Sequence, residues 1–400
     1  MKKLLYGTTA LATAGMILSA AGSANAQQEG EKKMSIEIHG YHQQWAVFNG
    51  GQDPNSPGGA DIDLSPLDQK HNSELCFIGE MELEAGFAIG INVQMEANTS
   101  ADQIDESYMY LESEKYGRLI LGDENNAAYL LQVVAPDGGI NMNQGDLTSM
   151  PNQGLLITPQ SFDLNDTTID GTRFRFDDND SGKFTYISPR FAGFQIGASY
   201  IPNYEGGGDN NNSITRVSVP GAQTTGGPGN APSGINEGAA VGLNFKQAFD
   251  GWGLQASAGY QYGNTVGLAA GGSADDLNAI GGGAQINFGG LVIGGSYTWA
   301  DGDKPNGAKY DGYGYDVGVA YSFGPYKVGL AYMRGENDGI NSNNYADYVV
   351  LSGTYKIGPG VDLVGGVYGF DLDGENGSAA PGQVSNNDGW GAATAFKLSF

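Results

Sequence analysis

The sequence predicts an all-β protein, a transmembrane antiparallel β-barrel of about 16 strands with short turns at one end and long loops at the other. Three observations predict it. Apolar residues recur at every second position within segments of about ten residues. Clusters of Gly, Asn, Asp and Pro separate these segments, and the connections alternate between short and long along the chain. A β-sandwich also shows alternation, but it has no reason to gather its short connections at one end.

The first 26 residues have the features of an export signal. Lys2 and Lys3 precede an apolar and small-residue stretch, and Ala24-Asn25-Ala26 supplies an A-x-A cleavage pattern. An N-terminal membrane anchor is the alternative, but the run is short and ends in small residues. We therefore expect a signal peptide at 1–26 and one barrel domain at 27–400. No later run reaches the 18 or more apolar residues of a membrane-spanning helix, so any contact with a membrane is expected to use β-structure.

The composition excludes two classes of protein. The chain has 19 Lys+Arg and 45 Asp+Glu, and removing the two lysines of the signal leaves 17 − 45 = −28 for the formal net charge. This charge repels a polyanion and argues against a nucleic-acid binder. Hydrophobic residues make up 40% of the chain, which is too many for an acidic disordered polymer.

The first strands follow the signal and contain clear alternation. In 87–97, Phe87, Ile89 and Ile91 fall on the face opposite Asn92 and Gln94. The tight connections 85–86 and 114–116 join neighbouring strands in this half of the chain. The strands predicted before the longest connection, 124–181, span 34–49, 72–84, 87–97, 104–113 and 117–123.

The later strands repeat the same arrangement with more regular lengths. In 312–323, Tyr, Val and Phe side chains fall on one face, and Gly, Asp, Ala and Ser fall on the other. Tight turns at 289–290, 324–325 and 358–360 alternate with long polar connections. The remaining predicted strands span 182–188, 194–202, 238–248, 253–264, 278–288, 291–300, 312–323, 326–335, 346–357, 361–372 and 389–400.

The faces of these strands predict which side meets lipid. In a membrane barrel the apolar face turns to the lipid, and the small and polar face turns to the lumen. Aromatic residues concentrate near strand ends, where interfacial girdles lie. These aromatics are Tyr200, Tyr260, Tyr262, Tyr297, Trp299, Tyr321, Tyr332 and Tyr355. In the last strand, Phe396, Leu398 and Phe400 share one face, which resembles the closing strand of exported barrels.

Two stretches resemble the general porins of Gram-negative bacteria, especially the alphaproteobacterial type. Residues 183–200 contain Ser188-Pro189-Arg190-Phe191-Ala192-Gly193-Phe194 and resemble the strand, SP-x-FAGF turn and strand of that family. Residues 116–122 resemble the strand that leads into its constriction loop. The resemblance implies an outer-membrane, sixteen-stranded homotrimeric barrel with loop 3, here 124–181, folded into the lumen. Thr185 stands where the family often has a basic residue.

The resemblance also implies a pore constriction with an acidic and a basic side. The candidates for the acidic side are Glu124, Asp137 and Asp146, and those for the basic side are Arg118, Arg173 and Arg175. Solvated loop charges are the alternative for each of them. The alternation places Arg118 on the lumen side, because Leu119 and Leu121 can take the lipid face.

Catalysis and metal chemistry have little support. His39 and His42 point to opposite faces of one strand, so they cannot share a metal. Acidic clusters at 177–180, 301–303 and 371–375 have oxygen ligands suited to Ca²⁺, but solvated loop acids are the favoured interpretation. We expect no enzyme activity and no cofactor.

These features predict an outer-membrane porin, a water-filled channel for the passive diffusion of small hydrophilic solutes and ions. The surplus of acidic residues predicts a preference for cations. The alternative is a sugar-specific channel or an exported β-sheet binding protein, for which we would expect aromatic residues along the lumen.

Overall fold

The computed structural model describes residues 34–55, 65–83, 86–98, 104–140, 157–162, 168–178, 181–204, 234–266, 273–304, 308–339, 343–374 and 384–400. The proposed signal peptide lies outside these residues.

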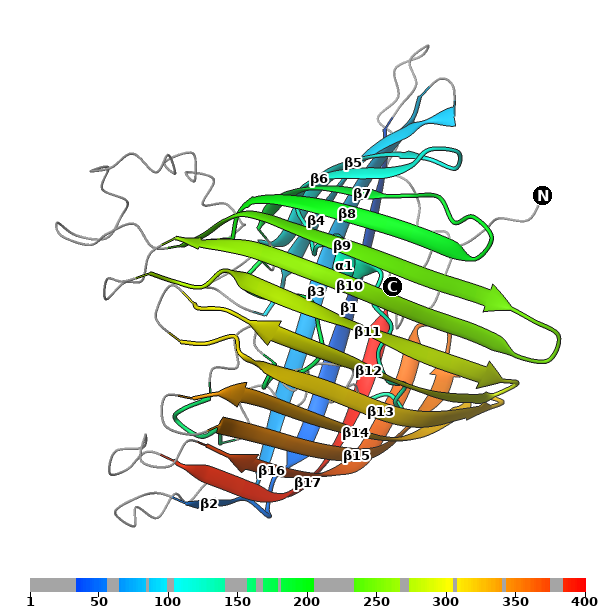
Figure 1. Ribbon diagram of the computed structural model, residues 1–400. Coiled ribbons are helices and arrows are strands. Elements are labelled where there is room, and N and C mark those ends of the chain that lie inside the picture. Colours follow the sequence, from blue (N-terminus) through cyan, green and yellow to red (C-terminus); the bar gives the residue numbers. More distant parts are fainter. Residues whose placement is uncertain are drawn as a thin grey trace.

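The described strands form one antiparallel sheet that closes on itself (Figure 1). Each long strand pairs with its neighbours in sequence, and β1 pairs with both β3 and β17, so the sheet has no free edge. The sheet has 17 strands, of which β2 has only three residues, and 17 − 1 leaves the 16 long strands that the sequence predicts. The strands are β1 (Ser35–Phe48), β2 (Asp53–Asn55), β3 (Leu67–Glu82), β4 (Ala88–Glu96), β5 (Ile104–Ser113), β6 (Gly117–Asp123), β7 (Gly182–Ile187), β8 (Phe194–Asn203), β9 (Gly234–Ala248), β10 (Gly253–Val266), β11 (Leu277–Phe288), β12 (Leu291–Asp301), β13 (Gly312–Phe323), β14 (Tyr326–Asp338), β15 (Asn343–Gly358), β16 (Val361–Asp373) and β17 (Asn386–Ser399).

Differences from the predicted strands lie mainly at the end of the barrel that carries the long loops. There β3 begins five residues earlier than predicted, at Leu67, and β9 begins four residues earlier, at Gly234. The short β2 pairs with β17 inside a connection predicted as a loop. Beyond the apolar band both faces of a hairpin are polar, so the hydrophobic pattern ends although the backbone ladder continues.

The two faces of the barrel have opposite chemistry, as the alternation predicts. Ile293, Val317 and Leu330 lie on the outer face and are about half exposed, at 46%, 50% and 48%. Thr298 and Asp316 lie on the inner face and are buried. Lipid chains offer no hydrogen bonds, so the surface that contacts them has to be apolar. The outer face of this barrel has that character. The aromatics Tyr200, Tyr297 and Tyr321 are exposed near strand ends, where an interfacial girdle would lie.

Tight turns close the other end of the barrel. Gly289 and Gly324 have φ values of +57° and +56°, which glycine adopts without the steric cost of a side chain. The chain can therefore reverse within two residues between β11 and β12 and between β13 and β14.

The single described helix, α1 (Ala127–Leu130), has one turn. Among the described residues, no helix has both the length and the apolar character needed to cross a membrane.

Candidate channel lumen and its constriction

The long connection after β6 enters the barrel and follows the inner wall. From Asn126 to Gly139 it passes successive strands from β8 to β17, and side chains of the wall bind its backbone at almost every step. These bonds join Ala127 N to Ser199 Oγ, Leu131 O to Asn244 Nδ2, Val133 N to Ser257 Oγ, Val134 O to Gln285 Nε2, Ala135 N to Asp316 Oδ1, Gly138 N to Ser352 Oγ and Gly139 O to Lys397 Nζ. The folded-in loop that the resemblance implies is therefore present.

The connection returns along the same wall. Thr168 donates to the backbone of Glu336 on β14, and Thr172 bonds Ser296 on β12 at 2.8 Å. Gln132 in the outgoing segment donates to the carbonyl of Thr172, so the two segments also hold each other. The described part of loop 3 thus consists of two segments, each bonded to the inner wall and to the other.

The returning segment alternates like a strand. Phe174, Phe176 and Asp178 are buried against the wall, whereas Arg173 and Arg175 are partly exposed on the opposite side. The two arginines therefore face the remaining lumen from the surface of the loop.

Glycines on the wall make room for the loop. Gly283, Gly318 and Gly329 lie on the inner faces of β11, β13 and β14, and a methyl group on any of them would overlap the backbone of the loop. Close packing of backbone on backbone requires glycine at such points. These glycines form a groove across the wall into which the loop fits.

A buried polar cluster ties the two ends of loop 3 together. Asn126 caps α1 by accepting from Ala128 N at 2.9 Å, and its Nδ2 donates to the carboxylate of Asp178. Gln261 on β10 also donates to Asp178 at 2.9 Å. The Nζ of Lys183 on β7 lies 3.9 Å from the same carboxylate, and both side chains are 1% exposed. Burial raises the pKa of Asp178, and Lys183 opposes this shift.

The lumen face of β1 and β3–β6 is acidic. Loop 3 covers part of this wall, where Asn125 donates to Glu106 at 2.8 Å and Leu130 packs with Tyr110. The carboxylates of the wall include Glu74, Glu80, Glu96, Asp105, Glu106 and Glu112. Glu74, Glu96 and Asp105 have carboxylate oxygens within 4.8 Å of one another and are partly exposed.

An irregularity in the sheet increases the acidity of this wall. The register between β4 and β5 shifts between Val93 and Met95. Consecutive residues of a regular strand face opposite sides, yet Asp105 joins the lumen cluster and Glu106 binds the lumen residue Gln94. The β-bulge therefore turns two consecutive acids to the lumen.

Arg118 lies on this wall, on the lumen side as the alternation predicts. Its guanidinium carbon is 4.1 Å from the centre of the Tyr110 ring, and its Nε is 3.7 Å from Glu112. Thr185, at the position of the family's basic residue, bonds Ser199 at 2.7 Å, and Ser199 in turn binds the loop at Ala127. In this chain, the residue at the family's basic position therefore helps to hold loop 3.

The other five constriction candidates lie on loop 3. Glu124 and Asp137 are buried, 7% and 1% exposed, and Asp137 lies 3.9 Å from Lys327 Nζ. Arg173 lies over the Tyr129 ring, and Arg175 pairs with Asp170 at 2.9 Å. Asp146 lies outside the described residues. The structure thus places Arg173 and Arg175 on the same loop as Glu124 and Asp137, and a constriction role for the six residues stays a prediction.

In two of the acidic clusters considered for Ca²⁺, an aspartate forms an ion pair with a lysine. Asp177 lies 3.6 Å from Lys304 Nζ, and Lys309 donates to Asp303. These ion pairs offer a local explanation for the acids, and Ca²⁺ binding there is untested.

The wall acids around Asp105 were missed by sequence reasoning. Alternation places Glu74 and Glu96 in strands, but it does not reveal that a bulge adds Asp105 to them. The signal that could have found them is the number of acids in the strands before loop 3.

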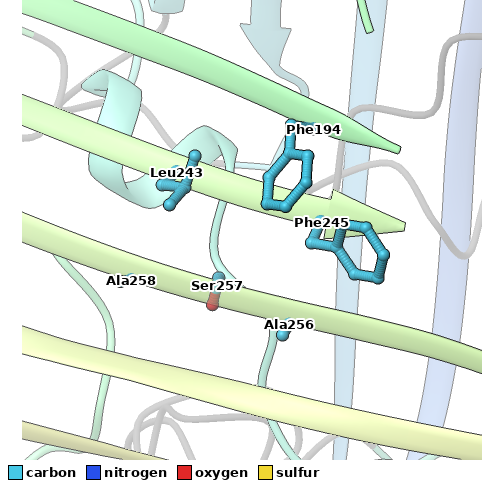
Figure 2. A pocket seen from close by; sticks show the side chains of 6 residues that line it. All are labelled: Phe194, Leu243, Phe245, Ala256, Ser257 and Ala258. Carbon is cyan, nitrogen blue, oxygen red and sulfur yellow. The ribbon is translucent and has the colours of Figure 1, made fainter. Parts of the chain in front are cut away.

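A hollow of about 360 Å³ lies on the outer surface over β8–β10 (Figure 2). Phe194, Leu243 and Phe245 form its rim, and Ala256 and Ala258 form its floor. The hydroxyl of Ser257 accepts from loop 3 on the lumen side, so the hollow is apolar. It belongs to the lipid-facing surface.

A closed membrane barrel with a loop folded against its inner wall is the architecture of a pore-forming outer-membrane protein. The profile of the Gram-negative porin family matches residues 7–375, and the chain belongs to that family. Family and fold place the protein in the outer membrane.

Comparison with known proteins gives one related sequence and several similar folds. An uncharacterized protein of Rickettsia bellii (strain RML369-C) is 24% identical over 317 residues, 68% of this chain and 71% of that protein. The anion-selective porin from Comamonas acidovorans has a TM-score of 0.58 at 16% identity and covers 92% of this chain and 100% of its own. In vitro folded OmpT of Vibrio cholerae, in its trimer form, has a TM-score of 0.54 at 12% identity, with the same coverage. At these identities the solved structures show a shared fold.

Proposed function

We propose that this porin is a homotrimeric, cation-preferring channel through which small hydrophilic solutes and ions diffuse passively, without a catalytic step. We also propose that residues 1–26 are removed on export. The observation that carries the cation preference is the acidic wall of β1 and β3–β6, above all Glu74, Glu96 and Asp105.

Carboxylates that line a narrow aqueous path raise the local concentration of cations and lower that of anions. At a distance of about 8 Å in water, one charge contributes about 0.5 kcal/mol, or roughly a twofold change in local ion concentration. The wall acids lie beside one another, so their potentials add.

The charges of loop 3 contribute less to the potential in the lumen, because opposite charges lie beside several of them. Arg175 pairs with Asp170, and Asp177 lies beside Lys304. Asp137 is buried beneath the loop. A neighbouring counter-charge reduces the potential that a group projects into the lumen.

The fold alone does not determine the sign of selectivity. The Comamonas acidovorans porin shares the fold and is anion-selective. The charges that each chain places on its lumen faces must therefore decide the sign.

The homotrimer is supported by the trimer form of the structurally similar OmpT and by family membership. The rival, a sugar-specific channel, needs exposed aromatic faces along the path. Arg118 covers the Tyr110 ring, which argues against sugar stacking at that position.

Reversal potentials across a KCl gradient in planar bilayers test the cation preference. We expect a cation-selective value for the native protein, larger in dilute salt because screening acts over about 8 Å at physiological salt. Glu74→Gln, Glu96→Gln and Asp105→Asn should each lower the cation-to-anion permeability ratio roughly twofold. Asp250→Asn, in the exposed turn between β9 and β10, is the matched control and should leave the ratio unchanged. An anion-selective native channel would refute the proposal.

A further inference from the structure

The hollow over β8–β10 is a groove in the lipid-facing surface (Figure 2). The rings of Phe194 on β8 and Phe245 on β9 stand beside one another, with centroids 4.7 Å apart, and Leu243 continues this side. Ala256 and Ala258 on β10 keep the floor low. Phe194 and Leu243 are 52% and 41% exposed, so the described part of the chain leaves the hollow open.

The low floor continues onto the next two strands. Ala258 lies opposite Gly282 on β11, and Ala256 lies opposite Ala284. Gly295 on β12 lies opposite Ala284 in turn. Residues directly opposite one another in an antiparallel pair face the same side of the sheet. The hollow therefore opens onto a low area of the outer face, into which a long ligand can extend.

The hollow lies in the half of the apolar band that is nearer to the tight turns. Phe245 is the fourth residue from the end of β9, and Ala256 is the fourth residue of β10. At about 3.4 Å per residue, the hollow begins about 10 Å along the strands from the turn. In outer-membrane barrels the short turns face the periplasm. The hollow is therefore surrounded by the hydrocarbon of the periplasmic leaflet.

An aromatic cluster marks the edge of this leaflet. Phe249, Trp252 and Phe288 lie at the turn end of the same strands, and their rings stack with centroids 4.3 and 6.4 Å apart. All three are exposed, and rings of this kind concentrate where hydrocarbon meets the headgroups. A lipid whose chain lies in the hollow thus has its headgroup close to the level of this cluster.

The volume of the hollow suits one hydrocarbon chain. An apolar cavity of about 150 Å³ holds a benzene ring, so about 360 Å³ offers room for roughly a dozen carbon atoms. Such a length is the larger part of a lipid acyl chain. The lining presents hydrocarbon on every side, because the hydroxyl of Ser257 is turned to loop 3.

We infer that the hollow holds one acyl chain of a phospholipid from the periplasmic leaflet, as a lipid that stays bound while its neighbours exchange. The inference goes beyond the proposed channel and does not depend on its ion selectivity.

Packing contacts explain why a chain stays in the hollow. A lipid gains no hydrophobic free energy when it moves from the bilayer to an apolar protein surface, since both are equally apolar. Dispersion contacts then decide which positions are occupied for long. A flat sheet contacts a chain from one side, whereas the floor and the Phe194 and Phe245 rings contact it from two.

A polar side chain lies where the headgroup is expected. Gln247 is exposed on the outer face of β9, two residues beyond Phe245 towards the turn. Its Nε2 donates to the carbonyl of Ala248 at 3.1 Å. A primary amide has two N–H donors, so the same nitrogen can also donate to an ester or phosphate oxygen of the lipid.

Native mass spectrometry tests the inference. Outer membranes that carry the mature chain are dissolved in a mild detergent, and the lipids retained by the washed protein are counted and identified by mass. We expect one phospholipid per chain in the native protein. Ala256→Leu places a larger side chain on the floor of the hollow and should lower the mean count at least threefold. Ala198→Leu, at an exposed outer position of β8 outside the hollow, is the matched control and should keep the native count.

Phe194→Ala repeats the test without added bulk. It removes one ring of the rim and should also lower the count at least threefold. Phe323→Ala is its control, because Phe323 is similarly exposed at the turn end of β13 and lies outside the hollow. Circular dichroism confirms that each variant is folded.

Three results would overturn the inference. The first is native protein without retained phospholipid, whether the hollow is empty or covered by another copy of the chain. The second is retained lipopolysaccharide in place of phospholipid. The third is an equal phospholipid count in the native protein and in a folded Ala256→Leu or Phe194→Ala variant.

Discussion

At the scale of single residues, a buried charge pair holds loop 3 in place. The carboxylate of Asp178 receives bonds from Asn126 on the loop and Gln261 on the wall, and Lys183 supplies the opposite charge. Removing one member of a buried ion pair leaves an uncompensated charge and costs about 3–5 kcal/mol. Both ends of the loop therefore depend on one cluster.

Lys183→Met tests this dependence. We expect the free energy of unfolding at pH 7.5 to fall by about 3 kcal/mol, because Asp178 becomes a buried charge without its cation. Burial already raises the pKa of Asp178, so the folded protein takes up this proton at a higher pH than the unfolded chain does. The group therefore favours the fold as the pH falls through its raised pKa towards the ordinary 3.8.

The loss caused by Lys183→Met should accordingly be smaller at pH 5 than at pH 7.5. Urea titrations in lipid vesicles at both pH values measure it. Lys246→Met, at an exposed position of β9, removes the same charge and should cost less than about 0.5 kcal/mol. An equal loss at both pH values would contradict the role assigned to Asp178.

At the scale of elements, the sequence predicts the strands far better than the path of the loop. Strand alternation records which face meets lipid, so β5, β6 and β13 have the predicted bounds. The path of loop 3 depends on glycines such as Gly283, whose role cannot be distinguished by sequence from that of a turn glycine such as Gly289. The side of the lumen on which Arg173 and Arg175 lie depends on that path, so the sequence could not determine it.

Gly283→Ala tests the groove that receives the loop. The added methyl group would overlap the carbonyl of Val133, and overpacking of this kind costs about 1–3 kcal/mol. We expect loop 3 to shift off the wall into the lumen, which lowers single-channel conductance and adds transitions between conductance levels. Gly365→Ala, where a methyl group meets only ordinary contacts, is the matched control. A native conductance trace for Gly283→Ala would count against the groove.

At the scale of the whole molecule, closure removes every edge from the sheet. The backbone bonds between neighbouring long strands must break together before the barrel opens, because no edge strand can peel away first. In the proposed homotrimer, contacts between the barrels stabilise each barrel further.

Electrophoresis tests the stability of the barrel and of the trimer. In SDS without heating, the protein should migrate as a trimer, and after heating it should migrate as a single unfolded chain. Circular dichroism of the unheated sample reports native β-structure. A monomeric band from a sample with native β-content would contradict the trimer.

The pairing of β1 with β17 has a further consequence for the order of assembly. Gly40 and Phe400 exchange backbone hydrogen bonds at 3.0 and 3.1 Å, so the closing seam joins segments that are about as far apart in the chain as any two strands can be. A contact of such long sequence separation carries the largest loop-closure entropy, and contacts of this kind slow folding. One edge of β1 stays unpaired until β17 has been made and has folded beside it. The ring therefore cannot close before the whole chain is present.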